Sequence, residues 1–201
     1  QEFRLAFSAT APVRFYCGGN GPKILKIAGE IMDGALIGNH YIPLVRSGRL
    51  DSLLAIRRAA AETKQPGKTL FDICELDISV SRDRDRALQF AKPSVAGIIL
   101  NLERIGFSDD EFHTLGIAPR LVQLLKEACA GGATVHAAST LIPDDAVTSC
   151  FVAGGPEECR DQIAALMDQA KRLHFGQIAF AKLGPDYDEA IKLLRHQVLP
   201  T

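Results

Sequence analysis

Residues Pro12–Asn39, PVRFYCGGNGPKILKIAGEIMDGALIGN, decide how the rest of the chain is organised. Apolar and polar residues alternate over 13–17, which predicts a short strand. The glycine-rich turn Gly18–Gly21 follows. Pro22 then suits the first position of a helix, because the backbone N–H that proline lacks would have no hydrogen-bond partner there. Apolar residues then recur on one helical face, with two more beside it: Ile24, Ile27, Ala28 and Ile31, then Leu25 and Met32. The apolar run 35–38 predicts a strand buried on both faces, so the stretch is a βαβ unit.

The turn between the first strand and this helix offers backbone N–H groups at a helix N-terminus. Orphan donors and the helix dipole both favour an anion there, so the turn is a candidate phosphate site. Glycine turns also occur simply as tight connections between a strand and a helix. The pattern is neither the spaced GxGxxG fingerprint nor a Walker loop nor a nucleophile elbow. Chemistry alone therefore leaves the phosphate site and the structural turn open.

Length and composition are those of one globular domain, which we assign to residues 1–201. The chain is 47% hydrophobic and 23% charged, with a net charge of -1, so neither a nucleic-acid surface nor a membrane patch is expected. The polar start QEFR is no signal peptide, and the first residue is not Met. Five cysteines without a CxxC pair favour a reduced, cytoplasmic setting, and no metal site is expected.

Strand and helix patterns alternate along the remaining chain. An extended segment is predicted over 1–11. Strands are predicted near 71–80 and 177–183, with a shorter one at 150–153. Helices are predicted over 44–64, from Ser81 with a kink or restart at Pro93, over 119–130, from 156 to about 173, and after 186. On the helix over 44–64, Arg49, Arg57 and Arg58 are predicted to lie away from the apolar face. A further helical stretch is predicted after Ser108, whose spacing to Glu111 is that of a capping box. The turn at Gly154–Gly155 resembles the first glycine turn, but the acids that follow it would repel a phosphate, so it is interpreted as structural. The alternation predicts a parallel sheet, either an open α/β layer or half of a (β/α)8 barrel.

The strand at 71–80 has two chemically different faces. Leu76, Ile78 and Val80 face one way, and Glu75, Asp77 and Ser79 face the other. Carboxylates on one side indicate that this side meets water or a polar cavity. An exposed edge strand would show the same pattern, so both interpretations stay open.

The chain resembles the luciferase-like monooxygenase superfamily. The resemblance lies in Pro12–Tyr16 with Gly21–Gly34, in the segment FVAGGPEE at 151–158 and in LGPD at 183–186. Within the superfamily it resembles the deazaflavin-dependent, methylenetetrahydromethanopterin reductase-like branch. The resemblance implies an α/β fold, namely the C-terminal half of a (β/α)8 TIM barrel, strands five to eight, with a helical insertion at about 101–149. We therefore expect a fragment of a longer protein, inactive by itself.

The resemblance also implies cofactor-binding residues. By position, the turn after the fifth strand would hold the cofactor phosphate; Asn39, at the carboxyl end of the next strand, could line the ring pocket. The residues concerned are Gly18, Gly19, Asn20, Gly21, Lys23 and Asn39. Lys23 could equally be a solvated surface lysine, and His40 is only a weak acid–base candidate because a lone loop histidine is more often a polar surface residue. Catalytic residues are not assigned.

The implied function is a flavin- or deazaflavin-dependent oxidoreductase that transfers hydride to or from a small organic substrate. The cofactor would be the deazaflavin coenzyme F-420, or alternatively FMN in an oxygen-using monooxygenase. Two other classes stay open: a non-catalytic flavin-binding protein, and a barrel lyase or isomerase that binds a sugar phosphate. The resemblance implies a small-molecule partner, no nucleic acid and no membrane, and leaves a homo-oligomer open.

Overall fold

The computed structural model describes residues 13–199, so the extended segment predicted for 1–11 lies outside the described residues. Five strands form one sheet: β1 (Tyr16–Gly18), β2 (Gly34–Ile37), β3 (Asp72–Val80), β4 (Val152–Gly154) and β5 (Phe175–Ala181). The helices of the first half are α1 (Pro22–Ile31), α2 (Tyr41–Arg46) and α3 (Arg49–Lys64). After β3 come α4 (Arg84–Arg104), α5 (Asp109–Thr114), α6 (Pro119–Ala130), α7 (Val135–Ala138), the 3-10 turn η1 (Ser139–Leu141) and α8 (Asp144–Val147). The chain continues with α9 (Pro156–Arg172), α10 (Tyr187–Leu193) and the π-helical turn η2 (Leu194–Val198).

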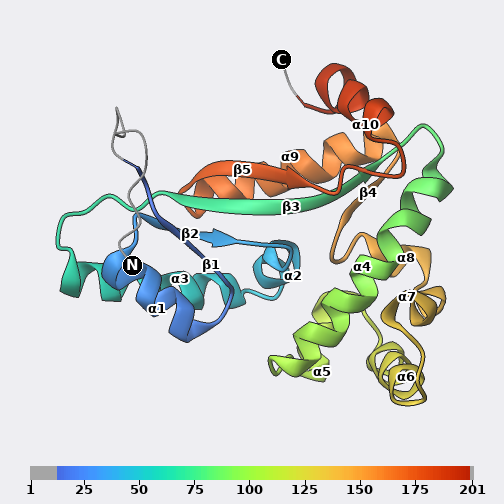
Figure 1. Ribbon diagram of the computed structural model, residues 1–201, viewed down its shortest axis with the longest axis horizontal. Helices are drawn as coiled ribbons and strands as arrows, with labels where there is room; N and C mark the ends of the chain where they lie inside the picture. The colour runs from blue at the N-terminus through green and yellow to red at the C-terminus, as the bar shows by residue number, and fades with distance from the viewer. Residues whose placement is uncertain (1–12, 200–201) are drawn as a thin grey trace, which may run out of the picture.

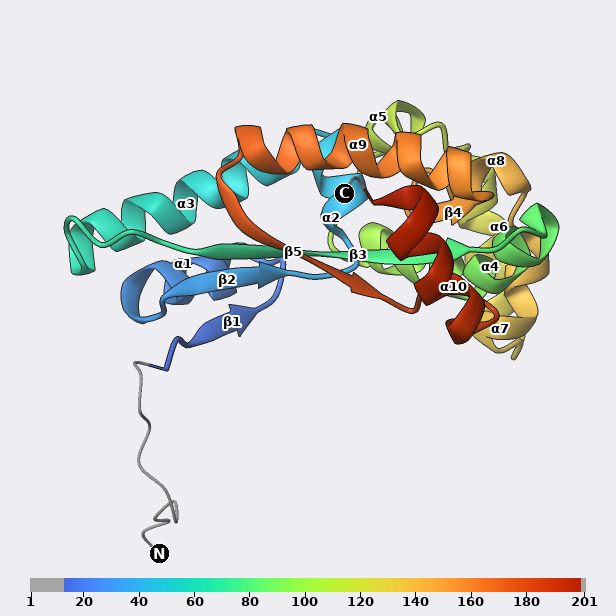
Figure 2. The same cartoon turned by 90° about the horizontal axis from the view of Figure 1, so that it is seen from above.

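Every strand pair in the sheet is parallel, as the alternation of strands and helices predicts. The order is β1-β2-β3, and β3 also pairs with β4 and β5. Figure 1 shows β3 and β5 side by side, and Figure 2 shows α3 and α9 along one side of the sheet. Because β3 has partners on both edges, the interpretation of 71–80 as an exposed edge strand is wrong. Successive parallel strands joined through helices are the repeating units of a (β/α)8 barrel.

The helices from α4 to α8 form a cluster beyond the carboxyl end of β3 (Figure 1). The expected helical insertion at about 101–149 falls within this cluster, and its bounds stay a prediction. Helix α4 runs without interruption through Pro93, so the predicted restart is wrong. Its N-cap is Asp83, which accepts a hydrogen bond from the Arg86 N–H at 3.1 Å, and not the predicted Ser81.

Helix α1 buries a different face from the one its isoleucines predict. Ile24, Ile27 and Ile31 are exposed, whereas Leu25 and Ala28 are buried together with Gly29. A side chain at Gly29 would place its Cβ only 2.2 Å from the Arg57 carbonyl oxygen. The smallest residue thus sets the buried face, because it lets α1 approach the backbone of α3 closely.

The helix predicted over 44–64 is two helices, α2 and α3, separated at Gly48. This glycine has φ +76°, a left-handed conformation that ends a helix. On α3, Arg57 lies inward, contrary to its predicted outward position, and it forms a buried ion pair with Asp72 of β3. The Asp72 carboxylate also accepts a hydrogen bond from the Ala35 N–H at 2.8 Å, so this pair ties α3, β2 and β3 together.

Two absences hold for the described range 13–199. No helix in it is long and apolar enough to cross a membrane. No group of three His, Cys, Asp or Glu side chains in it is placed to hold a metal ion.

Candidate functional site

A pocket of about 440 Å³ lies between the glycine turn and the C-terminal end of α4. The sheet-side wall comes from the turn before α1, His40 at the N-cap of α2, and the helices α2 and α3. The opposite wall comes from the C-terminal end of α4. The lining residues are Asn20, Gly21, Pro22, His40, Leu44, Arg49, Ser52, Leu53, Asn101, Arg104 and Ile105.

The N-terminus of α1 forms one end of this pocket and has free donors. Its N-cap is Gly21, which has no side chain to accept the first N–H groups, and the first turn contains no acidic residue. The turn itself is fixed against β2, because the Gly19 N–H donates to the Leu36 carbonyl oxygen at 3.2 Å. Uncapped donors and the positive end of the helix dipole favour an anionic group at this place.

The second glycine turn, before α9, is closed by its own carboxylate. The Gly155 N–H donates to Glu158 Oε2 at 2.8 Å, and Arg84 donates to the other carboxylate oxygen at 2.9 Å. The Arg84 hydrogen bond, followed by the Gly155 N–H, holds the pKa of Glu158 below its usual value. Two similar glycine turns therefore differ in their N–H donors. A carboxylate of the same turn accepts from the donor before α9, whereas no side chain caps the donors before α1.

His40 is the centre of the pocket wall and contacts both sides of it. Its side chain is buried, with 8% of the residue exposed. Its Nδ1 lies 2.9 Å from Asn20 Nδ2 in the glycine turn, and its Nε2 lies 2.7 Å from Asn101 Nδ2 on α4. Burial, and secondly the positive charge of Arg104, lowers the pKa of His40 below its ordinary value, so the neutral imidazole is favoured.

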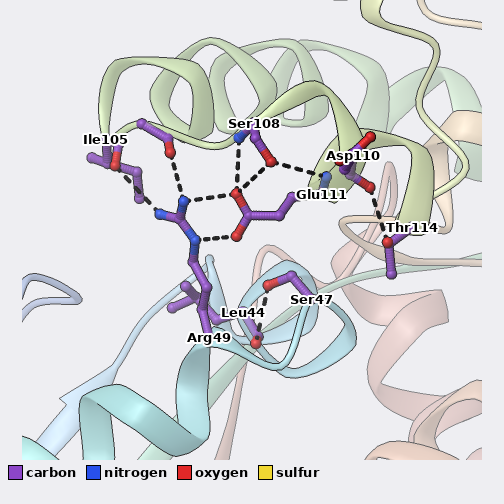
Figure 3. Close-up of polar contacts among 9 residues, drawn as sticks. Leu44, Ser47, Arg49, Ile105, Ser108, Asp110, Glu111 and Thr114 are labelled. Atoms are coloured by element: carbon purple, nitrogen blue, oxygen red, sulfur yellow. Dashed lines mark hydrogen bonds and ion pairs between the residues drawn. The ribbon is translucent and has the colours of Figure 1, made fainter.

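Arg49, at the start of α3, ties the insertion to the sheet side of the pocket (Figure 3). Its Nε donates to Glu111 Oε1, and its Nη2 donates to Glu111 Oε2 at 2.7 Å and to the Gly106 carbonyl oxygen at 2.5 Å. The guanidinium also lies 4.2 Å from the centre of the Phe107 ring. Glu111 belongs to the predicted capping box with Ser108, which is confirmed. The insertion is thus held in a fixed place over the pocket.

Arg104 supplies the pocket with a positive charge that no carboxylate of the described residues balances. Its Nε and Nη2 both donate to Asn101 Oδ1, at 3.1 and 2.8 Å. Within residues 13–199 it has no ion pair, whereas the charge of Arg49 is balanced by Glu111. A pocket with an unpaired guanidinium, an uncapped helix N-terminus and amide donors suits a phosphate or carboxylate group.

The structure brings some of the expected cofactor residues to this pocket and not others. Asn20 and Gly21 line it. Gly18 and Gly19 lie just before its rim, the exposed Lys23 lies one residue beyond it, and Asn39 is half-buried beside His40 without lining the pocket. The assignment of all six residues to a cofactor stays a prediction.

Three pocket residues were not found from the sequence: Arg49, Asn101 and Arg104. Asn101 and Arg104 share one face of a helix, three positions apart, which is a weak local signal. Nothing in the sequence places that face opposite a glycine turn 80 residues earlier, because the contact is made by the tertiary fold.

On the polar face of β3, Asp77 and Ser79 are buried, whereas Glu75 is half-buried. Asp77 and Ser79 are 2% and 0% exposed, and Ser79 Oγ donates to the Ala87 carbonyl oxygen of α4 at 2.8 Å. Burial raises the pKa of Asp77 to about 6, against an opposing effect of Lys182. Its Oδ2 has no hydrogen-bond partner in the described part of the chain. This face therefore contains a carboxyl group that is poised to gain or lose a proton near neutrality.

Fold and pocket together define an α/β protein built from βα units of the barrel type, with a helical insertion that covers a donor-rich pocket at the carboxyl ends of its strands. Residues 2–171 match the sequence profile of luciferase-like monooxygenases. The chain belongs to this luciferase-like family, and the expected fold class, half of a (β/α)8 barrel, is confirmed.

Individual relatives agree with the family match. The chain is 28% identical over 191 residues to a 5,10-methylenetetrahydromethanopterin reductase of Methanopyrus kandleri, covering 94% of this chain and 50% of that protein. It is 29% identical over 203 residues to the reductase of the same name from Methanolobus tindarius, covering 98% and 56%. A solved coenzyme F-420 dependent tetrahydromethanopterin reductase from Methanopyrus kandleri superposes with a TM-score of 0.68 at 25% identity, over 92% of this chain and 50% of that one. The chain spans about half the length of the curated relatives that it matches.

Proposed function

We propose that the protein containing this chain is an oxidoreductase dependent on the deazaflavin coenzyme F-420, and that this chain binds the phosphate of the cofactor in the pocket between α1 and α4. The observation that carries the proposal is the donor set of the pocket: the uncapped N-terminus of α1 lies in the same cavity as the unpaired Arg104. The names of the reductase relatives support the choice of a deazaflavin.

The pocket residues suit such a group in charge and in hydrogen bonding. Asn20 lines the pocket, and the atom of its amide without a partner among residues 13–199 is placed as Oδ1. A half-turn of this amide would put its N–H2 donor there, where it could bind an acceptor oxygen. A phosphate presents only acceptor oxygens at its charged edge, so backbone N–H groups, a guanidinium and an amide N–H2 are its natural partners.

The cofactor, when bound, supplies hydride transfer to or from a small organic substrate. The residues of this chain have three tasks: Gly21 and Arg104 bind the anionic end, His40 keeps the two walls of the pocket together, and Arg49 holds the insertion in place. Methylenetetrahydromethanopterin, which appears in the names of the relatives, is the first substrate to assay.

FMN is the second candidate cofactor, because the matched family is described as luciferase-like monooxygenases. Such an enzyme would use reduced flavin and oxygen, and its phosphate would need the same donors. The donors of the pocket suit the phosphate of either cofactor. Measured affinities for coenzyme F-420 and for FMN therefore have to distinguish the two.

The test is a parallel titration of the full-length protein with coenzyme F-420 and with FMN, followed by an assay of cofactor absorbance during turnover. We expect F-420 to bind at least about tenfold more tightly than FMN and its absorbance to change when the substrate is added. Tighter binding of FMN, with oxygen uptake, would replace the proposal by the monooxygenase. Binding without turnover would indicate a non-catalytic flavin-binding protein. Protection by a sugar phosphate without flavin binding would indicate a lyase or isomerase.

A further inference from the structure

Four side chains on the pocket wall form a continuous row of hydrogen bonds from Arg104 through Asn101 and His40 to Asn20. The contacts are 3.1 and 2.8 Å from Arg104 to Asn101, 2.7 Å from Asn101 to His40 and 2.9 Å from His40 to Asn20. Arginine has donors only, whereas asparagine and histidine can each reverse their direction. The direction of the whole row is therefore decided at the arginine end.

Arg104 fixes the orientation of the Asn101 amide. Two guanidinium N–H groups point at one atom of that amide, and only an oxygen can accept them. The atom of Asn101 that faces His40 is consequently the N–H2 group, which can only donate. His40 Nε2 must then accept, so it carries no proton. This agrees with the lowered pKa of the imidazole.

A neutral imidazole without a proton on Nε2 has its proton on Nδ1. The Nδ1–H points at the Asn20 amide, and it needs an oxygen there. In the structure the nearer amide atom is Nδ2, while Oδ1 is buried without a partner in the described part of the chain. Since the hydrogen bonds decide which amide atom is the oxygen, a half-turn of this amide gives the Nδ1–H its acceptor.

We infer that this row is a directional relay that turns the free atom of Asn20 into an N–H donor, and that it thereby makes the pocket selective for an anionic oxygen. With Asn20 Oδ1 bound to His40, the atom left without a partner among residues 13–199 is the N–H2 group. A buried donor without an acceptor is costly, so a ligand oxygen is the group that stabilises it. His40 acts as a positioning residue in this relay and not as an acid or base.

The inference rests on the proposed function for its ligand but not for its geometry. The relay requires the Nδ1–H tautomer of His40 whether or not a cofactor binds. The proposed function adds a second prediction, namely that the N–H2 group of Asn20 donates to an anionic ligand. The two parts can therefore be measured separately.

The first measurement is the tautomer of His40 in the unliganded protein, from the nitrogen-15 shifts of its ring, assigned by comparison with the His40→Gln variant. We expect Nδ1 to carry the proton and Nε2 to be unprotonated at neutral pH. A proton on Nε2 would overturn the relay directly.

The second measurement is the affinity for inorganic phosphate of two variants of similar size. His40→Gln retains an acceptor for Asn101 and a donor for Asn20, so we expect phosphate to bind within about threefold of the unchanged protein. His40→Leu has neither, and we expect at least about tenfold weaker binding. Equal affinities of the two variants would overturn the relay. If the unchanged protein has the expected tautomer but binds no phosphate, the anion assignment and the proposed function both fail while the relay stands.

Discussion

Arg49 and Glu111 form a two-point ion pair that joins α3 to the helical insertion. Both carboxylate oxygens of Glu111 accept from this guanidinium, and the hydrogen bond from Arg49 is the main reason why the pKa of Glu111 is lowered. The pocket lies between the two parts that this pair connects. The ion pair therefore determines the shape of the site although it stands at its edge.

Replacing Arg49 should loosen the insertion. We expect Arg49→Gln to lower the free energy of unfolding by about 1–2 kcal/mol, because a bidentate pair and a bond to the Gly106 carbonyl are lost together. Urea denaturation measures it. The control is Arg120→Gln, whose ion pair with Glu127 is exposed at 3.6 Å and should contribute less than about 0.5 kcal/mol. Equal effects of both variants would contradict the anchoring role.

Substitutions in the buried pair of Arg57 and Asp72 should have non-additive effects on the free energy of unfolding. Arg57→Met leaves a buried carboxylate without its cation, which should cost about 3–5 kcal/mol of unfolding free energy. The double variant Arg57→Met with Asp72→Asn removes both charges and keeps an acceptor for the Ala35 N–H. It should recover more than half of the loss in a thermal or urea melt. A double variant as unstable as the single one would show that the ion pair itself is not the cause.

Two helical glycines should respond oppositely to alanine. At Gly29 the added Cβ meets the Arg57 carbonyl oxygen at 2.2 Å, so Gly29→Ala should lower the free energy of unfolding by about 3 kcal/mol or more. At Gly97, within α4, the nearest atom is 3.9 Å away, so Gly97→Ala should be neutral or stabilise by about 0.5–1 kcal/mol. Differential scanning calorimetry of both variants checks this, and a stable Gly29→Ala protein would contradict the close contact of α1 with α3.

Asp77 predicts a pH dependence of stability. Its pKa is raised to about 6 in the folded chain, above the value of an unfolded aspartate, so folding favours the protonated form. The contribution is complete below about pH 4 and is lost as the pH rises through about 6. Unfolding free energies measured from pH 4 to 7.5 should fall less steeply in Asp77→Asn than in the unchanged protein. Parallel curves for the two proteins would mean that Asp77 does not titrate in this range.

The sequence was most informative where local chemistry decides structure. Pro22 and the glycines before it predict the start of α1, and the Ser108–Glu111 spacing predicts a capping box that forms as expected. Periodicity failed where one tertiary contact overrides it: Gly29 turned the buried face of α1 away from its isoleucines. Arg57 lies inward for a similar reason, because its partner Asp72 is supplied by a strand.

The candidate site was only half accessible to sequence reasoning. The glycine turn could be found because its residues are contiguous. Asn101 and Arg104 come from the insertion, and their position over Asn20 depends on long-range contacts such as that of Arg49 with Glu111. His40 was left as a weak candidate because its two amide partners lie 20 and 61 positions away.

The central claim is that the pocket between α1 and α4 binds the phosphate of coenzyme F-420, and the dissociation constant of F-420 for Arg104→Gln tests it most directly. Arg120→Gln, which removes an exposed arginine from another surface, is the matched control. We predict that Arg104→Gln weakens F-420 binding by at least about tenfold while Arg120→Gln leaves it within about twofold. Unchanged binding by a folded Arg104→Gln protein would contradict the account.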